Sequence, residues 1–569
     1  MAGFADVLLR GTILILGSLI LGGFVWLRLI LRAGPGVAPS APIVLALRVV
    51  AAGGGLVALA QTSTLLVALT ALRSAESWPL GEFVGTTFAR TALVRIVLGL
   101  TVGFLALGLS RRGAGPPAWH ALGAGAVTLV LSSAVLSHAV ARVESRELLL
   151  LLDAAHQLAA AVWIGGLAHL TLYAGTRGRQ VRRPRSVGAG AANTGKGVGG
   201  LFETVAGADT SDPSVRSRDV QAFPDEASVD EAVIIKRFSN LAFGSVMVLI
   251  VAGVALTWQY VGQWTGLAGT AYGVMVLSKV ILLAVILALA ALNFRAVRQA
   301  SAASGARLLR LVEVELGLGV TVLFAAASLT SLPPAVDVTI DRATVAEVAD
   351  RFRPTPPRLT SPPVAELIDQ AEPLMAPVTR REAVERAWSE YNHHWAGFFV
   401  LTMGLLAALE RLGVRAARHW PLVLLGLAGF LFLRNDPRAW PLGPAGFWES
   451  LTLPDVLQHR AFVVLIVAFA VFEWMVRTRR LPSTPWSYVF PLLCAIGGGL
   501  LLTHSHAMFN LKDEFLTEVT HAPIGILGAF VGWGRWLELR LPDAGRGAGW
   551  FWTACLIGVG LILIVYREA

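Results

Sequence analysis

The sequence predicts an all-α protein that crosses a membrane about fourteen times. Of its 569 residues, 55% are hydrophobic and only 15% are charged, whereas soluble domains have about 25% charged residues. The mean hydropathy of +0.65 agrees with this composition. The chain also contains repeated apolar runs of about 18 residues or more, each long enough to cross a bilayer as a helix.

Fourteen apolar runs follow one another along the chain, and each is predicted to form one membrane-spanning helix. They are residues 7–31, 43–71, 90–110, 118–141, 148–174, 238–262, 271–296, 307–333, 395–412, 418–434, 459–477, 486–504, 520–540 and 549–566. A polar stretch after the eighth run divides them into an eight-helix part and a six-helix part.

Basic residues between the runs predict the orientation of the chain. Lys and Arg accumulate in cytoplasmic loops, and five Arg-rich connections fall on one side if every run spans the membrane. They contain Arg111 and Arg112; residues 177–185; Arg295, Arg298, Arg307 and Arg310; Arg411, Arg415 and Arg418; and Arg477, Arg479 and Arg480. Both termini are therefore predicted to be periplasmic. Because this loop bias accounts for the net charge of +10, the charge does not predict nucleic-acid binding.

Two polar segments interrupt the helices. Residues 176–236 begin with basic residues and continue with Gly, Ser, Asp and Ala, so we expect a disordered cytoplasmic loop. Residues 336–392 are expected to form a periplasmic linker, with the Pro-rich stretch 353-RPTPPRLTSPP-363 and a short amphipathic helix near 377–391. These segments predict a membrane domain at 1–335 and a second one at 393–569.

Several function classes lack their sequence signals. Cys494 and Cys555 are the only cysteines and both lie in apolar runs, which argues against disulfides and CxxC metal sites. The chain contains no GxxxxGK[ST] phosphate loop, so no nucleotide-driven engine is expected. We do not expect an enzyme.

The histidines are concentrated on the predicted periplasmic side. Eight of the eleven lie there, namely His138, His156, His393, His394, His459, His504, His506 and His521. Imidazole is a common metal ligand, and a metal site needs three or four ligands from separate elements. We therefore predict a metal site from the five that belong to the six-helix part, namely His394, His459, His504, His506 and His521. Axial haem ligation and a polar interface without a ligand are the alternatives.

The stretch 504-HSHAMFNLKDEFLTEVTH-521 holds three of these histidines. In extended backbone, His504 and His506 would point the same way. Glu514 and Glu518 form an i, i+4 pair before His521 and could orient imidazoles or complete the coordination. His394 is preferred over its neighbour His393 because it lies nearer the apolar run.

Ionisable residues also occur inside the apolar runs of the eight-helix part, where they are costly and indicate function. Asp153 is expected to bond His156 by the i, i+3 spacing, and His138 lies near the same end. Lys279 and Glu315 are buried charges, and we expect Glu315 to be the carboxylate partner of Lys279. The pair would be either structural or part of a transport path.

Four stretches together resemble the CopD family of bacterial copper-resistance membrane proteins. They are 153-DAAHQLAAAVWIGGLAHL-170, 238-FSNLAFGSVMVLIVAGVALTWQYVG-262, 271-AYGVMVLSKVILLAVILALAALNFRAVRQ-299 and 310-RLVEVELGLGVTVLFAAASLTSLPPA-335. The resemblance covers roughly residues 1–335. The "H-S-H" and "T-H-x-P-I-G" elements resemble a His-rich extension of some CopD-like proteins.

The resemblance implies a bacterial inner-membrane protein that handles copper, often beside a periplasmic copper carrier of the CopC type. It also implies that His156, Lys279 and Glu315 match the helix histidine and buried charges of the family. We therefore predict copper binding, as Cu(I) or Cu(II), at the periplasmic face, followed by transport or resistance. A haem b electron-transfer protein and a copper-delivery assembly factor without transport are the alternatives.

Overall fold

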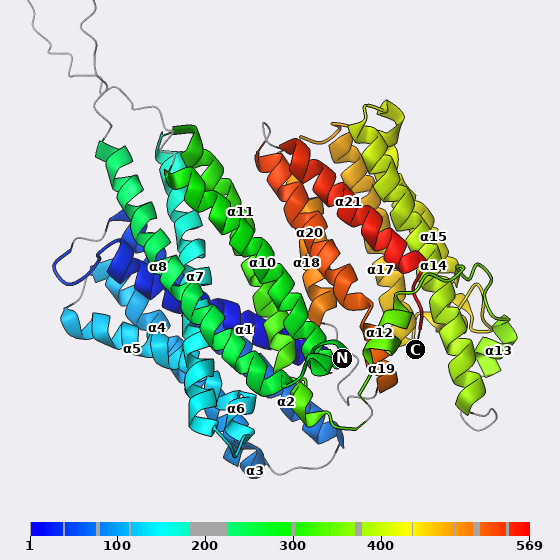
Figure 1. Cartoon of the computed structure of the whole chain (residues 1–569), viewed down its shortest axis with the longest axis horizontal. Coiled ribbons are helices and arrows are strands. Elements are labelled where there is room, and N and C mark those ends of the chain that lie inside the picture. Colours follow the sequence, from blue (N-terminus) through cyan, green and yellow to red (C-terminus); the bar gives the residue numbers. More distant parts are fainter. Residues whose placement is uncertain are drawn as a thin grey trace, which may run out of the picture.

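The computed structural model describes residues 2–37, 40–75, 80–112, 115–181, 226–298, 302–340, 342–369, 378–434, 436–482, 484–503, 512–541 and 545–568. Within these ranges every regular element is a helix, which confirms the predicted all-α class. Each of the fourteen predicted runs falls on a helix. The helices pack into a bundle with the eight-helix part on one side and the six-helix part on the other (Figure 1).

The eight-helix part is built from long helices joined by short helical turns. Its long helices are α1 (Ala2–Val25), α2 (Ala41–Ala75), α4 (Thr87–Arg112), α5 (Pro116–Leu131), α7 (Arg146–Val181), α8 (Glu226–Val261), α10 (Ala271–Arg298) and α11 (Ala302–Leu329). Its short elements are η1 (Trp26–Ile30), α3 (Leu80–Gly85), η2 (Ala134–Leu136), α6 (His138–Ala141), α9 (Trp264–Gly269) and η3 (Ala335–Asp337).

The six-helix part follows two short connecting helices, α12 (Val345–Arg351) and α13 (Val364–Asp369). Its long helices are α14 (Val378–Arg411), α15 (Val423–Arg434), α17 (Pro454–Arg477), α18 (Val489–Thr503), α20 (His521–Arg540) and α21 (Gly545–Ile564). Its short elements are η4 (Arg415–Leu422), α16 (Phe447–Ser450), η5 (Trp486–Tyr488) and α19 (Lys512–Glu518).

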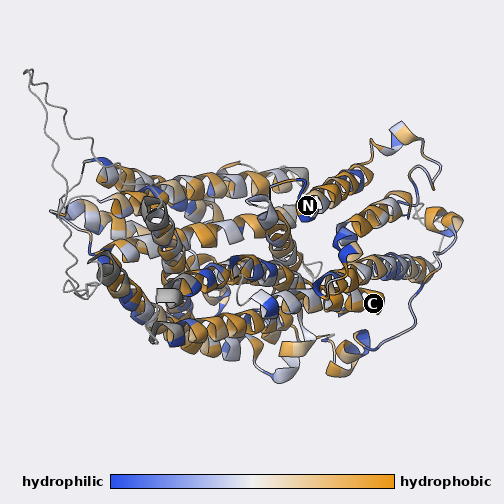
Figure 2. Cartoon of the chain, turned by 90° about the horizontal axis from the view of Figure 1, so that it is seen from above, coloured by the Kyte–Doolittle hydropathy of each residue, from blue (hydrophilic) through white to orange (hydrophobic). Residues whose placement is uncertain are grey.

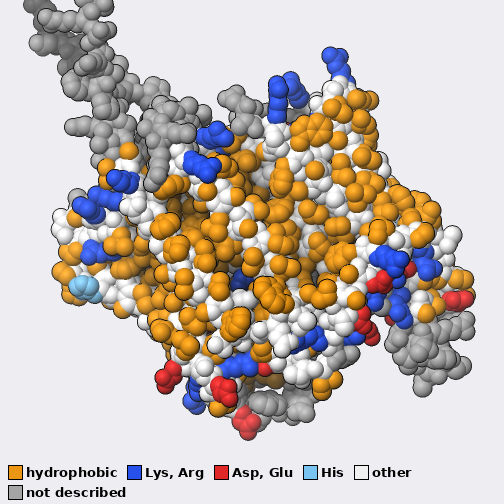
Figure 3. All heavy atoms as spheres, in the orientation of Figure 1, with side chains coloured by type: hydrophobic (Ala, Val, Ile, Leu, Met, Phe, Trp, Pro, Cys, Tyr) orange, Lys and Arg blue, Asp and Glu red, His pale blue; other side chains and the backbone are white. Residues whose placement is uncertain are grey.

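The surface is that of a membrane protein. Among the described residues, twelve helices are long and apolar enough to span a bilayer. α11 and α14 are not among them, so the count of fourteen stays a prediction. Hydrophobic side chains cover most of the middle of the face in Figure 3, with charged side chains mainly toward its edges. Seen from above, hydrophobic residues run along all the long helices (Figure 2).

The bundle has an outer and an inner end, named after the predicted orientation in the membrane. The outer end carries both chain termini, α12 and α19, which lie at the same end of the molecule (Figure 1). The inner end is the opposite one and includes Arg411 and Arg540. This naming follows the prediction that the termini are periplasmic.

Helical structure extends further than the sequence predicted. The expected disordered loop at 176–236 is wrong at its edges, because α7 continues to Val181 and α8 begins at Glu226; residues 182–225 lie outside the described ranges. The expected short helix near 377–391 is not a separate element, because α14 runs from Val378 to Arg411 without a break. No Pro or Gly separates the two predicted pieces, so the helix continues.

The fourth predicted run is shorter as a helix than expected. α5 ends at Leu131, and the chain continues through η2 and α6. The hydroxyl of Ser132 donates to the carbonyl of Leu129 at 2.6 Å, and the Ser133 hydroxyl accepts from Arg95 at 2.9 Å. Serine side chains that bond nearby backbone weaken a helix, which explains the break before His138.

The two parts are joined along α11, which packs against α18 and α20. Gly317 of α11 lies against the Trp533 ring, where an added Cβ would come within 2.1 Å of a ring carbon. Glu313 accepts hydrogen bonds from Trp536, at 3.0 Å, and from Arg540. Charged side chains of α20 therefore tie the six-helix part to the domain before it.

Candidate metal centre

Three ring side chains from separate elements meet at the outer end of the six-helix part. His393 lies on α14, His521 is the first residue of α20, and Tyr566 follows α21. The His393 ring stacks on Tyr566 with centroids 3.9 Å apart. The His521 ring lies edge-on to both, 5.6 Å from Tyr566 and 5.9 Å from His393. The fold thus brings two imidazoles together from positions 128 residues apart in the sequence.

Backbone hydrogen bonds fix the tautomer of both imidazoles. His393 Nδ1 lies 2.9 Å from the Ser389 carbonyl oxygen, and His521 Nδ1 lies 3.2 Å from that of Thr517. A carbonyl only accepts, so each Nδ1 carries the hydrogen and each Nε2 carries the lone pair. Metal-ligating histidines are commonly oriented in this way, with the other ring N–H bound to a carbonyl.

A carboxylate holds the third ring in place. Glu568 accepts hydrogen bonds from the hydroxyls of Ser389 and Tyr566, both at 2.6 Å. Burial and the Glu568 charge raise the pKa of Tyr566, so its phenol stays protonated and acts as a donor. Tyr566 therefore supports the His393 ring by stacking and offers no phenolate ligand.

Glu514 supplies an unsatisfied acceptor near this end. Its Oε2 is buried and has no hydrogen-bond partner within the part of the chain that is described. Glu514 lies seven residues before His521 and four residues before Glu518. Such spacings place all three residues on one face of a continuous helix. The helix is interrupted by a turn at residues 519 and 520, so the alignment is local to each segment. A carboxylate is a suitable additional ligand for an imidazole-bound metal.

His394 has a structural role in this arrangement, in contrast to the expectation that it would be the ligand rather than His393. Its Nδ1 accepts from the backbone N–H of Arg358 at 2.7 Å, and its Nε2 donates to the Tyr566 carbonyl at 2.8 Å. The side chain is 2% exposed. A metal could bind His394 only after one of these bonds breaks. The two neighbours have different contacts because adjacent helical residues point about 100° apart: His393 stacks on the Tyr566 ring, whereas His394 bonds the Tyr566 carbonyl.

Among the described residues, the predicted ligand His459 lies outside this cluster. His459 Nδ1 lies 2.7 Å from Asp436 Oδ1, and its side chain is 41% exposed. His504 and His506 lie outside the described residues. Across the described ranges, no three His, Cys, Asp or Glu side chains form a group able to hold a metal ion.

In the eight-helix part, the two histidines predicted as metal ligands form hydrogen bonds between helices. His156 Nδ1 lies 3.1 Å from the Leu249 carbonyl of α8, and His138 Nε2 lies 3.0 Å from the Leu329 carbonyl of α11. Asp153 accepts from Gln157 at 2.9 Å, so the bond expected between Asp153 and His156 is replaced by an i, i+4 contact. The metal-binding role of His138 and His156 stays a prediction.

Lys279 and Glu315 are not partners. Glu315 accepts a hydrogen bond from Asn293, which lies 14 residues after Lys279 on α10, or about 21 Å of helix rise. The expected pair is wrong because α10 and α11 run antiparallel. Two residues at the same number of residues from the starts of these helices therefore lie toward opposite ends of the bundle.

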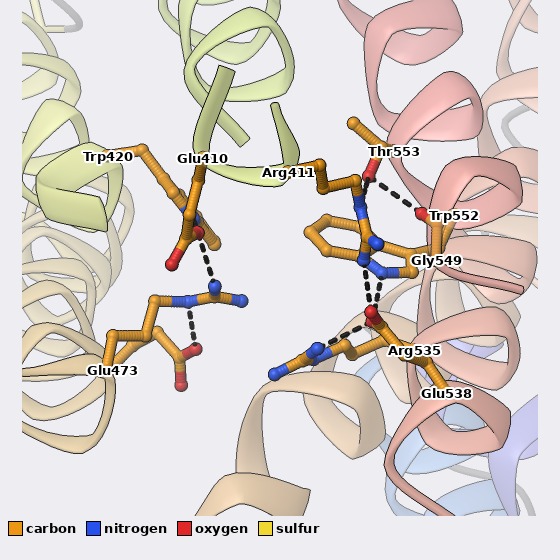
Figure 4. Close-up of polar contacts among 10 residues, drawn as sticks. Glu410, Arg411, Trp420, Glu473, Arg535, Glu538, Gly549, Trp552 and Thr553 are labelled. Atoms are coloured by element: carbon orange, nitrogen blue, oxygen red, sulfur yellow. Dashed lines mark hydrogen bonds and ion pairs between the residues drawn. The ribbon is translucent and has the colours of Figure 1, made fainter. Parts of the chain in front are cut away.

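A network of buried charges, not predicted from the sequence, lies at the inner end of the six-helix part (Figure 4). Arg477 donates to Glu473 and Glu410, both at 2.8 Å. Glu538 accepts from Arg411, Arg535 and the Trp552 indole at 2.5, 2.6 and 2.7 Å. Glu473 and Glu538 interrupt apolar runs in the sequence, and that interruption was the available signal.

This network is remote from the imidazole pair. Glu410 follows His393 by 17 residues on α14, which corresponds to about 25 Å along the helix. The network links α14, α17, α20 and α21 through three arginines and three glutamates, so its formal charges balance.

Comparison with protein families matches residues 232–329 to the CopD family, described as Copper resistance protein D. The match begins within α8 and ends at the last residue of α11. No curated protein matches the chain, and no solved structure does. The matched segment contains Lys279 and Glu315 and ends before the six-helix part begins. Residues 232–329 are therefore similar to the CopD family, and the rest of the chain lies outside this match.

Proposed function

We propose that this protein binds copper at the periplasmic face of a bacterial inner membrane and moves it across or holds it there. His393 and His521 would be the receiving pair. The observation that carries this choice is that the two rings meet from separate helices, with centroids 5.9 Å apart. Each ring donates its Nδ1–H to a carbonyl one turn earlier, as metal-ligating histidines commonly do. The family match supports copper as the ion.

The donor set suits copper. Imidazole nitrogen is a good ligand for Cu(II) and is accepted by Cu(I), and a copper ion would sit about 2 Å from each Nε2, as other borderline metals do. Glu514 could add a carboxylate. From the sequence, His504 and His506 are proposed to complete the site. A periplasmic carrier of the CopC type is the proposed donor of the ion.

Metal analysis and an optical spectrum of the purified protein test this proposal. We expect bound copper in the wild type and a loss of that copper in the double variant His393→Ala/His521→Ala. His120→Ala is the matched control, because His120 is exposed on the first turns of α5 and is predicted to be cytoplasmic. Copper content unchanged in the double variant would refute the site.

The same samples separate the alternatives. A Soret band with stoichiometric haem and no copper would identify a haem protein instead. Copper uptake into proteoliposomes would indicate transport, whereas a delivery factor would bind copper without uptake. A separate His504→Ala/His506→Ala variant tests the sequence-based ligands, and loss of copper there with His393 intact would add them to the site.

A further inference from the structure

Four arginines stand at the inner end of the six-helix part without an acidic partner. Arg415 and Arg418 lie on η4, and Arg479 and Arg480 lie just after α17. All four are exposed. The ion pairs of this end use other arginines, and within the described ranges none joins these four to a carboxylate. In Figure 3 basic side chains project from this end, whereas the acidic side chains visible on that face lie nearer the outer end. We call these four residues the arginine patch.

The two elements that carry the arginine patch are joined by a histidine and a tryptophan. The Trp474 indole of α17 donates to His419 Nδ1 of η4 at 2.8 Å. The Arg480 guanidinium lies over the Trp474 ring, 4.3 Å from its centroid. Arg418 Nε lies 3.5 Å from His419 Nε2. Arg418 and Arg480, which are 62 residues apart in the sequence, therefore flank one pair of hydrogen-bonded rings.

The tautomer of His419 leaves two donors facing each other. An indole N–H only donates, so His419 Nδ1 is the acceptor and carries no hydrogen. A charged imidazole is excluded because both of its nitrogens would donate, and a neutral one then has its hydrogen on Nε2. Arg418 Nε–H and His419 Nε2–H are thus donors whose nitrogens lie 3.5 Å apart, and neither accepts from the other. A single oxygen atom that accepts from both would satisfy them.

A phosphate oxygen is the acceptor that suits this surroundings best. Guanidinium groups bind phosphate through parallel N–H donors. Stacking on Trp474 covers a face of Arg480 and leaves its N–H edge free to donate. Water could also accept from Arg418 and His419, but it would leave the charge of four arginines uncompensated. An anion supplies both the acceptor and the charge.

Exposed apolar side chains border the arginine patch on both sides. Leu412 and Val414, just before Arg415, are 68% and 45% exposed. Trp486, six residues after Arg480, is 44% exposed, and Trp is typical of the membrane interface. A soluble phosphate would leave these side chains unused, whereas a phospholipid has acyl chains beside its phosphate. Basic surfaces at the cytoplasmic ends of spanning helices bind acidic lipid headgroups.

We propose that the arginine patch binds the headgroup of an acidic phospholipid, with its phosphate between Arg418, His419 and Arg480. Trp474 holds His419 as a donor at Nε2, and the other two arginines add charge at the rim. The bound lipid would then link η4 to the end of α17. The bias of arginine toward cytoplasmic loops accounts for the charge of these residues but does not require that they meet at one pair of rings. The proposal is independent of copper, because the imidazole pair lies at the opposite end of α14.

Native mass spectrometry of the full-length protein in non-ionic detergent tests the site. Phosphatidylglycerol and phosphatidylcholine with identical acyl chains are added separately, and the lipid-bound fraction is measured. We expect phosphatidylglycerol to bind more tightly, and Arg418→Gln/Arg480→Gln to weaken its binding about 25-fold, since each basic residue near an anionic surface contributes about fivefold in affinity. Equal binding of the two lipids by the wild type would overturn the proposal, whether or not the variant folds.

A matched double variant separates this site from general positive charge. Arg295 and Arg307 are exposed at the inner ends of α10 and α11, so Arg295→Gln/Arg307→Gln removes the same charge from the eight-helix part. We expect this control to bind phosphatidylglycerol nearly as the wild type does, and an equal loss in the two double variants would overturn the proposal. Inorganic phosphate is the second probe. If it raises the unfolding temperature of the wild type as much as phosphatidylglycerol does, the site takes a soluble anion and the assignment to lipid is wrong.

Discussion

Replacing His394 with alanine should destabilise the outer end of the six-helix part without removing copper ligands. The change deletes the acceptor for the Arg358 N–H and the donor for the Tyr566 carbonyl, at 2.7 and 2.8 Å. The side chain is 2% exposed, so water does not replace these bonds in the intact fold. A buried polar group left unpaired costs about 1–3 kcal/mol, so two cost about 2–6 kcal/mol.

Partial replacements should recover part of this loss. Asn at position 394 can place its side-chain oxygen near the former Nδ1 and accept from Arg358. Gln can place its nitrogen near the former Nε2 and donate to Tyr566. Each should therefore restore about 1–3 kcal/mol, one bond each. Thermal unfolding of the detergent-solubilised protein should rank the alanine variant lowest, with Asn and Gln between it and the wild type.

Copper content measured on the same variants separates structure from ligation. We expect His394→Asn and His394→Gln to bind copper as the wild type does, and His393→Ala to bind less copper. A stable His394→Ala protein that has lost its copper would refute the reasoning. That result would return His394 to the ligand role predicted from the sequence.

Two further predictions concern helix packing and an ion pair. Gly165→Ala should lower the unfolding temperature, because its Cβ would lie 1.8 Å from the Ser18 carbonyl oxygen and overpacking costs about 1–3 kcal/mol. Gly175→Ala on the same helix is the control: its Cβ meets nothing within 4 Å, so the variant should be neutral or stabilising. Equal losses of unfolding temperature in the two variants would contradict this prediction. Lys512 and Thr344 lower the pKa of Glu347 from 4.5 to about 2, so the contact between α12 and α19 stabilises the fold above pH 4.5 and is lost as pH falls toward 2. NMR titration of Glu347 should show this pKa rising in Lys512→Gln, and an unchanged value would count against the ion pair.

The fold could be predicted largely from the sequence, because spanning helices are specified locally. A run of about 20 apolar residues needs only its own backbone hydrogen bonds to be stable in lipid. All fourteen predicted runs are accordingly helices, and the breaks follow local signals such as Ser132 and Ser133. The extension of α14 back to Val378 was missed because a polar helix end has no hydrophobicity signal. The helix count and the orientation stay predictions.

The candidate site could be predicted only in part. The composition identified the outer end of the six-helix part as rich in histidine, and His521 was predicted as a ligand. The sequence favoured His394 over His393 as a ligand, whereas in the structure both ring nitrogens of His394 bond backbone groups, so we propose His393 instead. Tyr566 was not considered. Which of these side chains face one another depends on how each helix is rotated about its axis. A helix surrounded by lipid is apolar on most of its faces, so its sequence specifies this rotation only weakly.

What the sequence by itself determined is the class of protein: an all-α membrane protein with stretches in roughly residues 1–335 that resemble the CopD family, of which the family comparison matches residues 232–329. Composition, run length and local motifs contain that information because each acts within one helix. The tertiary structure decided which side chains meet. It brought the His393 ring beside that of His521 and separated Lys279 from Glu315. These contacts depend on the depth and rotation of antiparallel helices packed together, and no single run of residues specifies either.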